Sequence, residues 1–383
     1  MDLGPCRDCD LRHRGREEVR LGGPQGDGEM RDCLSMFEPP TGPRGRGAAT
    51  NPQSRFEKLE VVAEGAPPDR VPTLFLRDDS RSIIARNESP DVPFNASINP
   101  YRGCEHGCIY CYARNYHEYL GFSAGLDFET RILVKQQAPE LLRRELGSDR
   151  WRPQVLGISG ATDPYQPIER KLELTRRCLE VLVDYRNPAS IVTKNALVTR
   201  DGDLLGDLAR YDAVSVALSI PTLDAELVRV MEPRTSHPRE RLKAIRRLTA
   251  RGIPCGVMVA PVIPGLTDHE IPAVIEAASE AGASFAIWLM LKLPGAVSEL
   301  FQNWLEVHYP DRRDKVLNRI RSLRGGRLSD SRFGKRMRGE GAFTEQVAAL
   351  FDSACRQHGV SGPGPTLSVS DFRRAGVHQL PLW

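Results

Sequence analysis

From residue 131 to residue 295, short apolar runs alternate with segments whose apolar residues recur every three or four positions. The runs predict buried strands and the periodic segments predict amphipathic helices. After a first short strand at 96–99, we expect strands at 154–159, 190–193, 213–220, 253–262 and 285–291, and helices at 169–185, 204–210, 240–251 and 269–281. Such alternation is typical of a parallel sheet with outer helices. With right-handed crossovers, it predicts an α/β fold, a partial (β/α)6 barrel.

The flanking segments differ from this core. Gly, Pro, Arg and Asp dominate the N-terminal part, which cannot bury enough apolar surface to offset its ordering entropy. The expected division is a disordered tail at 1–55, a loop-rich lead-in at 56–94, a core domain at 95–296 and a basic helical extension at 297–383.

Further elements are expected outside the barrel pattern. We predict short strands near Phe75 and Ile83–Ile84, a helix from Cys111 to Tyr119, a closing helix at 343–358 and strand character near 367–369. Tyr116 and Tyr119 in the first of these helices are expected to pack into the core.

Composition limits the function classes only weakly. The 383 residues carry a formal net charge of +3, which says little about partners. No run of about 18 apolar residues indicates a membrane span, and Met1–Arg20 lacks the apolar stretch of a secretory signal. The odd count of nine cysteines fits a reducing compartment. We therefore expect a cytoplasmic monomer without a membrane partner.

Three cysteines cluster directly after the first core strand. Cys104, Cys108 and Cys111 have the spacing C-x-x-x-C-x-x-C, and Gly103 and Gly107 let the backbone wrap closely around a compact inorganic group. Three thiolates leave one iron of a [4Fe–4S] cluster without a protein ligand. An open position can bind a substrate or cofactor, whereas a fully ligated site mainly carries electrons or structure.

Other interpretations of the cysteines remain open. Cys104, Cys108 and Cys111 could bind zinc together with His106, although zinc motifs usually pair C-x-x-C units. They could also be structural cysteines that happen to lie together. A second zinc site could use Cys6, Cys9, His13 and Cys33, against the simpler interpretation of a disordered tail.

Polar residues and Gly/Pro turns follow each predicted strand. In barrels of this kind, chemistry lies beyond the C-terminal strand ends. The segments concerned are 159–169, 193–195, 232–234, 260–268 and 292–295, with Ser219 at the end of its strand. They gather on the rim that also bears the cysteines, so we expect the active site there.

The cysteine spacing resembles the radical S-adenosylmethionine (SAM) superfamily. Together with the segments Tyr101–Tyr112, Thr162–Glu169, Thr193–Asn195, Glu232–Arg234 and Ala260–Gly265, it resembles the spore photoproduct lyase-like branch, also described as DNA repair photolyase-like, most of whose members lack a known substrate. The segments 45–56 and 334–341 are similar to an uncharacterised bacterial subfamily of this branch.

The resemblance implies a chemistry. Cys104, Cys108 and Cys111 would ligate a [4Fe–4S] cluster, and SAM would chelate the fourth iron through its amino and carboxylate groups. One electron, supplied by a donor such as flavodoxin or ferredoxin, would then cleave SAM to methionine and a 5′-deoxyadenosyl radical. The reaction would be a lyase or another radical transformation. The alternatives are repair of a nucleic-acid lesion, or an iron–sulfur or zinc protein without turnover.

The resemblance also implies residue roles. Tyr110 would lie beside the SAM adenine, and Lys194 or Arg234 would pair with the SAM carboxylate. Asp163 either contacts the amino group or caps the following helix. The remaining cofactor contacts are expected from Ser159, Gly160 and Thr162 to the amino group, from Ser219 to the ribose, and from Val262 and Ile263 beside adenine, unless these last two only pack in the core.

Tyr110 and Tyr112 match tyrosines that this branch uses in hydrogen-atom transfer. The branch's lyase also uses a separate cysteine as hydrogen donor, for which this sequence offers no clear counterpart. Cys178 lies among apolar helical residues and Cys255 lies inside a strand, so both are expected to be inert buried thiols.

The C-terminal extension is strongly basic. Its cations between 312 and 338 are Arg312, Arg313, Lys315, Arg319, Arg321, Arg324, Arg327, Arg332, Lys335, Arg336 and Arg338. Such a stretch predicts either contact with a nucleic-acid backbone or a solvated helical face.

Overall fold

The larger sheet forms the centre of the fold. The computed structural model describes residues 42–56, 69–360 and 362–374. The strands of this sheet are β2 (Ile84–Arg86), β3 (Ala96–Ile98), β6 (Leu156–Ile158), β7 (Ala189–Thr193), β8 (Val214–Ser219), β9 (Cys255–Val262) and β10 (Phe285–Met290). Their order is β10-β9-β8-β7-β6-β3-β2. All neighbours from β10 to β3 are parallel, and β2 joins β3 in the antiparallel sense.

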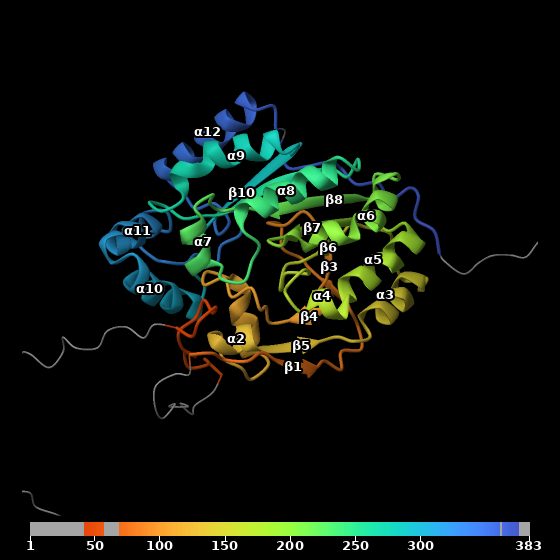
Figure 1. The fold of residues 1–383 in the computed structure, drawn as a ribbon, viewed down its shortest axis with the longest axis horizontal. Coiled ribbons are helices and arrows are strands. Elements are labelled where there is room, and N and C mark those ends of the chain that lie inside the picture. Colours follow the sequence, from red (N-terminus) through yellow and green to blue (C-terminus); the bar gives the residue numbers. More distant parts are fainter. Residues whose placement is uncertain (1–41, 57–68, 361, 375–383) are drawn as a thin grey trace, which may run out of the picture. The chain divides into compact units, whose positions relative to one another are not determined.

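Helices connect and cover these strands (Figure 1). They are α3 (Ala138–Gly147), α4 (Glu169–Leu172), α5 (Leu174–Tyr185), α6 (Gly202–Ala209), α7 (Ala225–Met231), α8 (Pro238–Thr249) and α9 (Ile271–Glu280), with 3-10 turns η2 (Ala196–Asp201) and η3 (Asp268–Glu270). Leu179, Leu205, Ile245 and Val274 from four of the helices share one core with strand residues such as Val216. The predicted partial (β/α)6 barrel is therefore confirmed.

A small second sheet leads to the cysteines. It contains β1 (Leu74–Arg77), β4 (Tyr101–Arg102) and β5 (Arg131–Val134) in the order β1-β5-β4. The short elements η1 (Tyr112–Arg114), α1 (Asn115–Glu118) and α2 (Leu126–Thr130) lie between β4 and β5. Because β4 ends two residues before Cys104, this sheet fixes the start of the cysteine segment, and Cys104 N donates to Phe128 O of α2 at 2.9 Å.

The C-terminal extension belongs to the same compact unit as the barrel. It contains α10 (Ala296–His308), α11 (Pro310–Ser322) and α12 (Ala342–Gln357). Figure 1 shows α12 alongside α9, and Phe351 packs against Trp288 of β10 with ring centroids 6.2 Å apart. The predicted closing helix is therefore confirmed.

The segment 323–341 joins the two edges of the open barrel. At one edge, Met290 N donates to Met337 O at 2.9 Å, and Arg324 donates to Leu291 O at 2.5 Å. At the other edge, Asp91 in the β2–β3 connection accepts from Gly334 N at 2.7 Å and pairs with Arg336. The segment thus closes the side of the barrel on which no strand of the described residues continues the sheet.

The expected helix 169–185 is interrupted. Glu173 has a φ of +52°, which separates α4 from α5. The carboxylate of Glu169 accepts from Thr175 N at 3.0 Å and Arg176 N at 3.4 Å, two donors that the first turn of α5 leaves free. Capping by a residue of the preceding turn stabilises the interruption, which periodicity alone cannot predict.

Three other expectations need correction. The predicted helix 111–119 is only η1 followed by α1, and Tyr116 and Tyr119 are exposed rather than packed in the core. Residues 367–369 form no strand. Residues 1–41 of the predicted tail lie outside the described residues, and so does the candidate zinc set of Cys6, Cys9, His13 and Cys33. From Gly42 onward the chain packs into the fold, and Ala48 is fully buried. In the described parts of the chain, every helix is too short or too polar to cross a bilayer.

Candidate functional site

The cysteine loop, residues 99–112, turns through two left-handed glycines. Gly103 has a φ of +80° and Gly107 of +67°, as their predicted role requires. A Cβ on Gly107 would lie 2.7 Å from the Glu129 carboxylate. The thiols of Cys104, Cys108 and Cys111 are free and lie close enough to interact electrostatically. The loop therefore directs three unpaired thiols into one region.

The ring nitrogens of His106 point to residues other than the three cysteines. In the described residues, no three His, Cys, Asp or Glu side chains converge at the distances a single ion needs. His106 lies with Nδ1 3.4 Å from Asp163 Oδ2 and with Nε2 3.2 Å from Asn195 Nδ2, so both ring nitrogens face other partners.

Burial raises the pKa of all three thiols. For Cys104 and Cys108, nearby carboxylates add to this effect, Asp163 for the first and Glu232 for the second. Protonated thiols are poor ligands, so a metal group held by these three residues would have to displace their protons and supply the positive charge.

A buried ion pair fastens the back of the cysteine loop. Arg114 and Glu129 are both fully buried and 2.5 Å apart. Arg114 also donates to the carbonyls of Gly107 at 3.1 Å and Cys108 at 3.0 Å. Glu129 accepts from Gly47 N and Ala48 N, at 3.0 and 2.8 Å. One pair thus joins the loop to the N-terminal segment 42–50.

The front of the loop is fastened by the segment after β6. Gln166 is fully buried, accepts from Glu105 N at 3.0 Å and donates to Gly103 O at 3.2 Å. Glu105 accepts from Ile168 N at 2.9 Å and pairs with Arg234 at 3.1 Å. Arg234, predicted to bind the SAM carboxylate, therefore already neutralises a carboxylate of the loop.

Tyr110 belongs to a buried polar cluster. Its hydroxyl donates to Glu232, whose other oxygen lies 2.5 Å from Arg241. Lys194 lies 3.5 Å from Glu232 and donates to Ser219 Oγ at 2.5 Å. Burial opposes ionisation of Glu232, but Arg241 and Lys194 outweigh it and lower its pKa. The structure thus brings the predicted residues Tyr110, Lys194 and Ser219 together around one carboxylate.

Asp163 is held by three parts of the chain. It accepts from Tyr165 N at 2.9 Å, Thr193 Oγ1 at 2.7 Å and Lys194 N at 2.7 Å, and it faces His106. Burial would raise the pKa of Asp163, but His106 and these hydrogen bonds lower it. The carboxylate is therefore ionised and does not cap α4, whose N-cap is Ile168.

The rim of the site contains Tyr112, Gly160 and Lys292. Tyr112 OH donates to Gly160 O at 2.5 Å, and Lys292 Nζ lies 4.1 Å from the centroid of the Tyr112 ring. Burial, with Arg336 and Arg324 nearby, lowers the pKa of Lys292 to about 8. No carboxylate of the described residues pairs with Lys292. A Cβ on Gly160 would meet open space, so this backbone borders free volume.

The remaining predicted residues occupy the same rim. Thr162 is buried and donates to Tyr101 O at 3.3 Å, while Ser159 precedes Gly160 in the loop after β6. Val262 and Ile263 are fully buried, and Ile263 shares a core with Cys108 and Tyr110. The assigned contacts of these residues with SAM stay predictions.

Four residues of the site had no individual role predicted from the sequence: Arg114, Glu129, Glu232 and Lys292. Glu232 and Lys292 do lie in the predicted rim segments 232–234 and 292–295. Arg114 and Glu129 pair across 15 positions, and no local pattern indicates that.

The basic C-terminal stretch is partly neutralised. Arg324 is buried against backbone carbonyls, so it cannot contact a nucleic acid as expected. Arg319, Arg332 and Arg336 pair with Asp268, Asp330 and Asp91. The number of cations free for an external phosphate is therefore smaller than the sequence suggests.

Comparison with known families decides the class. The sequence model of the radical SAM superfamily matches residues 98–278, which include the three cysteines and the strands from β6 to β9. The chain belongs to the radical SAM superfamily. Its relatives include an uncharacterised protein of Mycobacterium tuberculosis strain H37Rv, 38% identical over 244 residues, or 62% of this chain and 71% of that protein. An uncharacterised protein of Methanocaldococcus jannaschii is 29% identical over 58% of this chain and 79% of its own length.

Solved structures of spore photoproduct lyase have a similar fold. The lyase complexed with dinucleoside spore photoproduct superposes with a TM-score of 0.56 at 16% identity, covering 75% of this chain and 81% of that one. A mutant of the same lyase, with a single tyrosine replaced by phenylalanine, gives a TM-score of 0.54 at 16% identity, over 75% and 80% of the two chains. At this identity, the likeness establishes the fold alone.

Proposed function

We propose that this protein binds a [4Fe–4S] cluster through Cys104, Cys108 and Cys111 and reductively cleaves SAM. The observation that carries the proposal is the loop with three free thiols at the C-terminal rim of a radical SAM barrel. The cluster supplies the electron that splits SAM into methionine and a 5′-deoxyadenosyl radical. The protein itself supplies positioning and exclusion of water.

The residues around the loop support a SAM site. Gly160 borders open volume beside Tyr112, which suits contact between loop backbone and the SAM amino group. Asp163, kept ionised, adds negative charge for that amino group. Lys194 and Ser219 retain their proposed roles toward the carboxylate and ribose, and Tyr110 and Ile263 toward adenine. Both cations already face a carboxylate, Arg234 that of Glu105 at 3.1 Å and Lys194 that of Glu232 at 3.5 Å, and we favour Lys194 for the SAM carboxylate because its own ion pair is the longer one.

The test is anaerobic reconstitution with iron and sulfide, followed by dithionite and SAM. We expect 5′-deoxyadenosine and methionine from the wild type, and none from a Cys108→Ala variant. A protein that binds metal tightly but forms no 5′-deoxyadenosine would instead be a binding protein without turnover.

A second candidate is spore photoproduct lyase-like repair of a nucleic-acid lesion. The exposed Tyr112 on the rim and the shared fold support it, and Arg312, Arg321 and Arg327 would provide phosphate contacts. Against it, Cys178, Cys255 and Cys355 are all buried, and none of them reaches the rim as a hydrogen donor. Anaerobic incubation with DNA that contains the spore photoproduct tests this candidate, since restored thymines support it and unchanged lesions contradict it.

We also infer a cytoplasmic, monomeric protein that receives its electron from a carrier such as flavodoxin or ferredoxin. The low-potential chemistry of a cluster with an open iron position supports a reducing compartment.

A further inference from the structure

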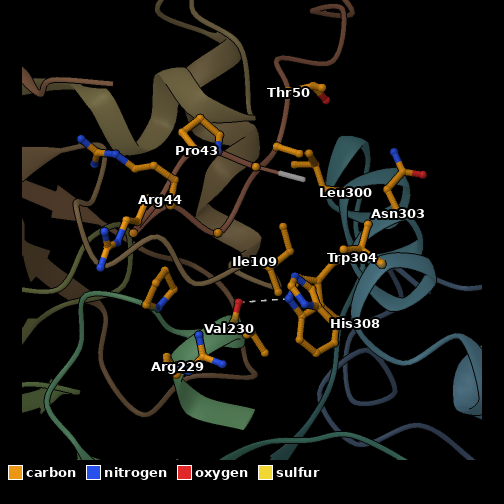
Figure 2. Close-up of a pocket in the computed structure, with 17 residues that line it drawn as sticks. Pro43, Arg44, Thr50, Ile109, Arg229, Val230, Leu300, Asn303, Trp304 and His308 are labelled. Atoms are coloured by element: carbon orange, nitrogen blue, oxygen red, sulfur yellow. Dashed lines mark hydrogen bonds between the residues drawn. The ribbon is translucent and has the colours of Figure 1, made fainter. Parts of the chain in front are cut away.

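A groove runs behind the cysteine loop (Figure 2). It has a volume of about 480 Å³ and lies between the N-terminal segment 42–50, the end of α7 and one face of α10. Ile109, Val230, Leu300 and Trp304 form its apolar floor. Figure 2 shows Trp304 in the middle, where its indole N–H donates to Val230 O at 3.0 Å. This bond fixes the floor, so the groove is preformed.

The charged side chains that line the groove are all basic. Arg44, Arg46, Arg229 and His308 line it, and no aspartate or glutamate of the described residues does. The Arg46 guanidinium already donates hydrogen bonds to Glu129 O, Val71 O and Thr73 Oγ1. Burial and Arg229 lower the pKa of His308, so at neutral pH this imidazole is uncharged. The available positive charge therefore comes from Arg44 and Arg229, which are both exposed.

Neighbouring carboxylates reduce this charge only in part. Arg229 pairs with Glu226 at 2.9 Å on the solvent side, where both side chains are largely exposed. Exposed pairs of this kind are weak and rearrange easily. Arg44 pairs with no carboxylate in the part of the chain that the structure describes. The groove thus keeps positive charge available for an acidic partner.

The groove also lies directly against the cysteine loop. Ile109, which lines it, stands between Cys108 and Tyr110. Gly47, also in the lining, packs so closely that a Cβ there would lie 1.8 Å from Gly107 O. None of the residues proposed to contact SAM lines the groove. The groove therefore borders the cysteine loop through Ile109 and Gly47 and uses none of the residues assigned to SAM.

We propose that this groove is the docking surface for an acidic one-electron carrier protein of the flavodoxin or ferredoxin type. The inference rests on the proposed function. In the encounter, the reduced carrier loses one electron and the cluster gains it, passing from [4Fe–4S]²⁺ to [4Fe–4S]⁺, and no bond or proton changes place. Electron-transfer encounters bury little surface and rely on opposite charges for steering, so a small basic groove suits such a partner.

The experiment compares two reductants. A reconstituted double variant, Arg44→Glu with Arg229→Glu, is reduced either by dithionite or by a reduced flavodoxin, and cluster bleaching is followed by stopped-flow absorbance. An Arg150→Glu, Arg152→Glu variant, altered at exposed arginines just beyond α3, gives the same charge change away from the groove. Asn303→Asp adds negative charge to the groove without removing an arginine, which covers the case in which the double variant does not fold.

At low salt, we expect the second-order rate constant with flavodoxin to fall by about tenfold or more in the groove double variant and by a smaller factor in Asn303→Asp, with no change in the distal variant. The difference should shrink at about 0.5 M salt, because screening weakens steering. Rates with dithionite, which is itself an anion, are compared at about 0.5 M salt, where screening removes steering, and should be equal in all variants.

Equal flavodoxin rates in wild type and both groove variants would overturn the proposal, and so would an equal loss in the distal variant. A loss that also appears with dithionite would place the effect in the cluster rather than in docking, and would overturn it too. Failure of the proposed function is distinguishable, since the wild type would then form no 5′-deoxyadenosine even with dithionite.

Discussion

The two sides of the cysteine loop differ in how their charges are balanced. Behind the loop, Arg114 pairs with Glu129, and beneath it Arg241 pairs with Glu232, all of them buried. On the rim, Lys292 lies over Tyr112 without a carboxylate partner among the described residues. The buried ion pairs hold the cysteine loop in shape, whereas the unpaired ammonium of Lys292 is available to a ligand.

The two sides of the cysteine loop also differ in the exposure of their tyrosines. Tyr110, which turns inward, is buried and bonded to Glu232, whereas Tyr112, two residues later, faces the rim and bonds only to a backbone carbonyl. Of the two tyrosines that the resemblance implies for hydrogen-atom transfer, Tyr112 is therefore the more exposed, and we propose it as the one that a substrate reaches.

The largest effect is expected from Arg114→Met. It leaves Glu129 as an unpaired buried charge, which costs about 3–5 kcal/mol. The free energy of unfolding, measured anaerobically with urea, should fall by that amount, and bound iron should be lost. The control is Arg143→Met, which breaks an exposed pair with Asp184. It should cost less than about 1 kcal/mol. Similar costs for the two variants would contradict the distinction between the sides.

His117, a buried histidine of α1 that packs against Phe128, makes stability depend on pH. Burial lowers its pKa to about 4 from the ordinary 6.5. Between these values the unfolded chain binds the proton and the folded protein does not, so stability falls as pH falls from 6.5 towards 4. Over this range, protonation of His117 in the unfolded chain should lower the free energy of unfolding by about 3 kcal/mol, or about 1.4 kcal/mol for each pH unit.

Urea unfolding across this pH range measures that contribution. His117→Gln should flatten the profile, whereas His269→Gln, at an exposed histidine, should leave it unchanged. A His117→Gln profile as steep as that of the wild type would show that other groups carry the dependence.

A matched pair of tyrosine variants sharpens the comparison. Tyr110→Phe removes a buried hydrogen bond from the tyrosine hydroxyl to Glu232. Its loss should lower the free energy of unfolding by about 1–3 kcal/mol. Tyr112→Phe removes an exposed hydrogen bond and should cost less than about 1 kcal/mol. Thermal melting under anaerobic conditions measures both changes. If Tyr112→Phe proved the more destabilising, the assignment of the two sides would be wrong.

The smallest effect on stability is expected from Lys292→Met. The lost cation–π contact, worth about 0.5–1 kcal/mol, is offset by the relief of a partly buried charge. Stability should therefore change by less than about 1 kcal/mol, while the rate constant of SAM cleavage falls by about tenfold. Lys243→Met, at an exposed lysine paired with Glu240, should alter neither quantity. A Lys292→Met enzyme with the wild-type rate would show that the rim charge has no ligand.

Sequence patterns predicted the barrel because its strands are short continuous apolar runs, such as Phe285–Met290, and because the cysteines and their glycines lie within one loop. They could not predict the 42–50 segment or the Arg114–Glu129 pair. Those contacts join residues up to 83 positions apart, and their residue types are equally common on solvated surfaces. Lys292 lies in the predicted rim segment 292–295, but only the fold brings it over Tyr112.

The central claim is that three thiolates hold a four-iron cluster whose remaining iron binds SAM. Mössbauer spectroscopy of the anaerobically reconstituted ⁵⁷Fe protein, with and without SAM, tests this most directly. We expect four irons per chain and a change at one of the four when SAM is added. A spectrum that SAM leaves unchanged, or a purified protein that takes up zinc in place of iron, would contradict it.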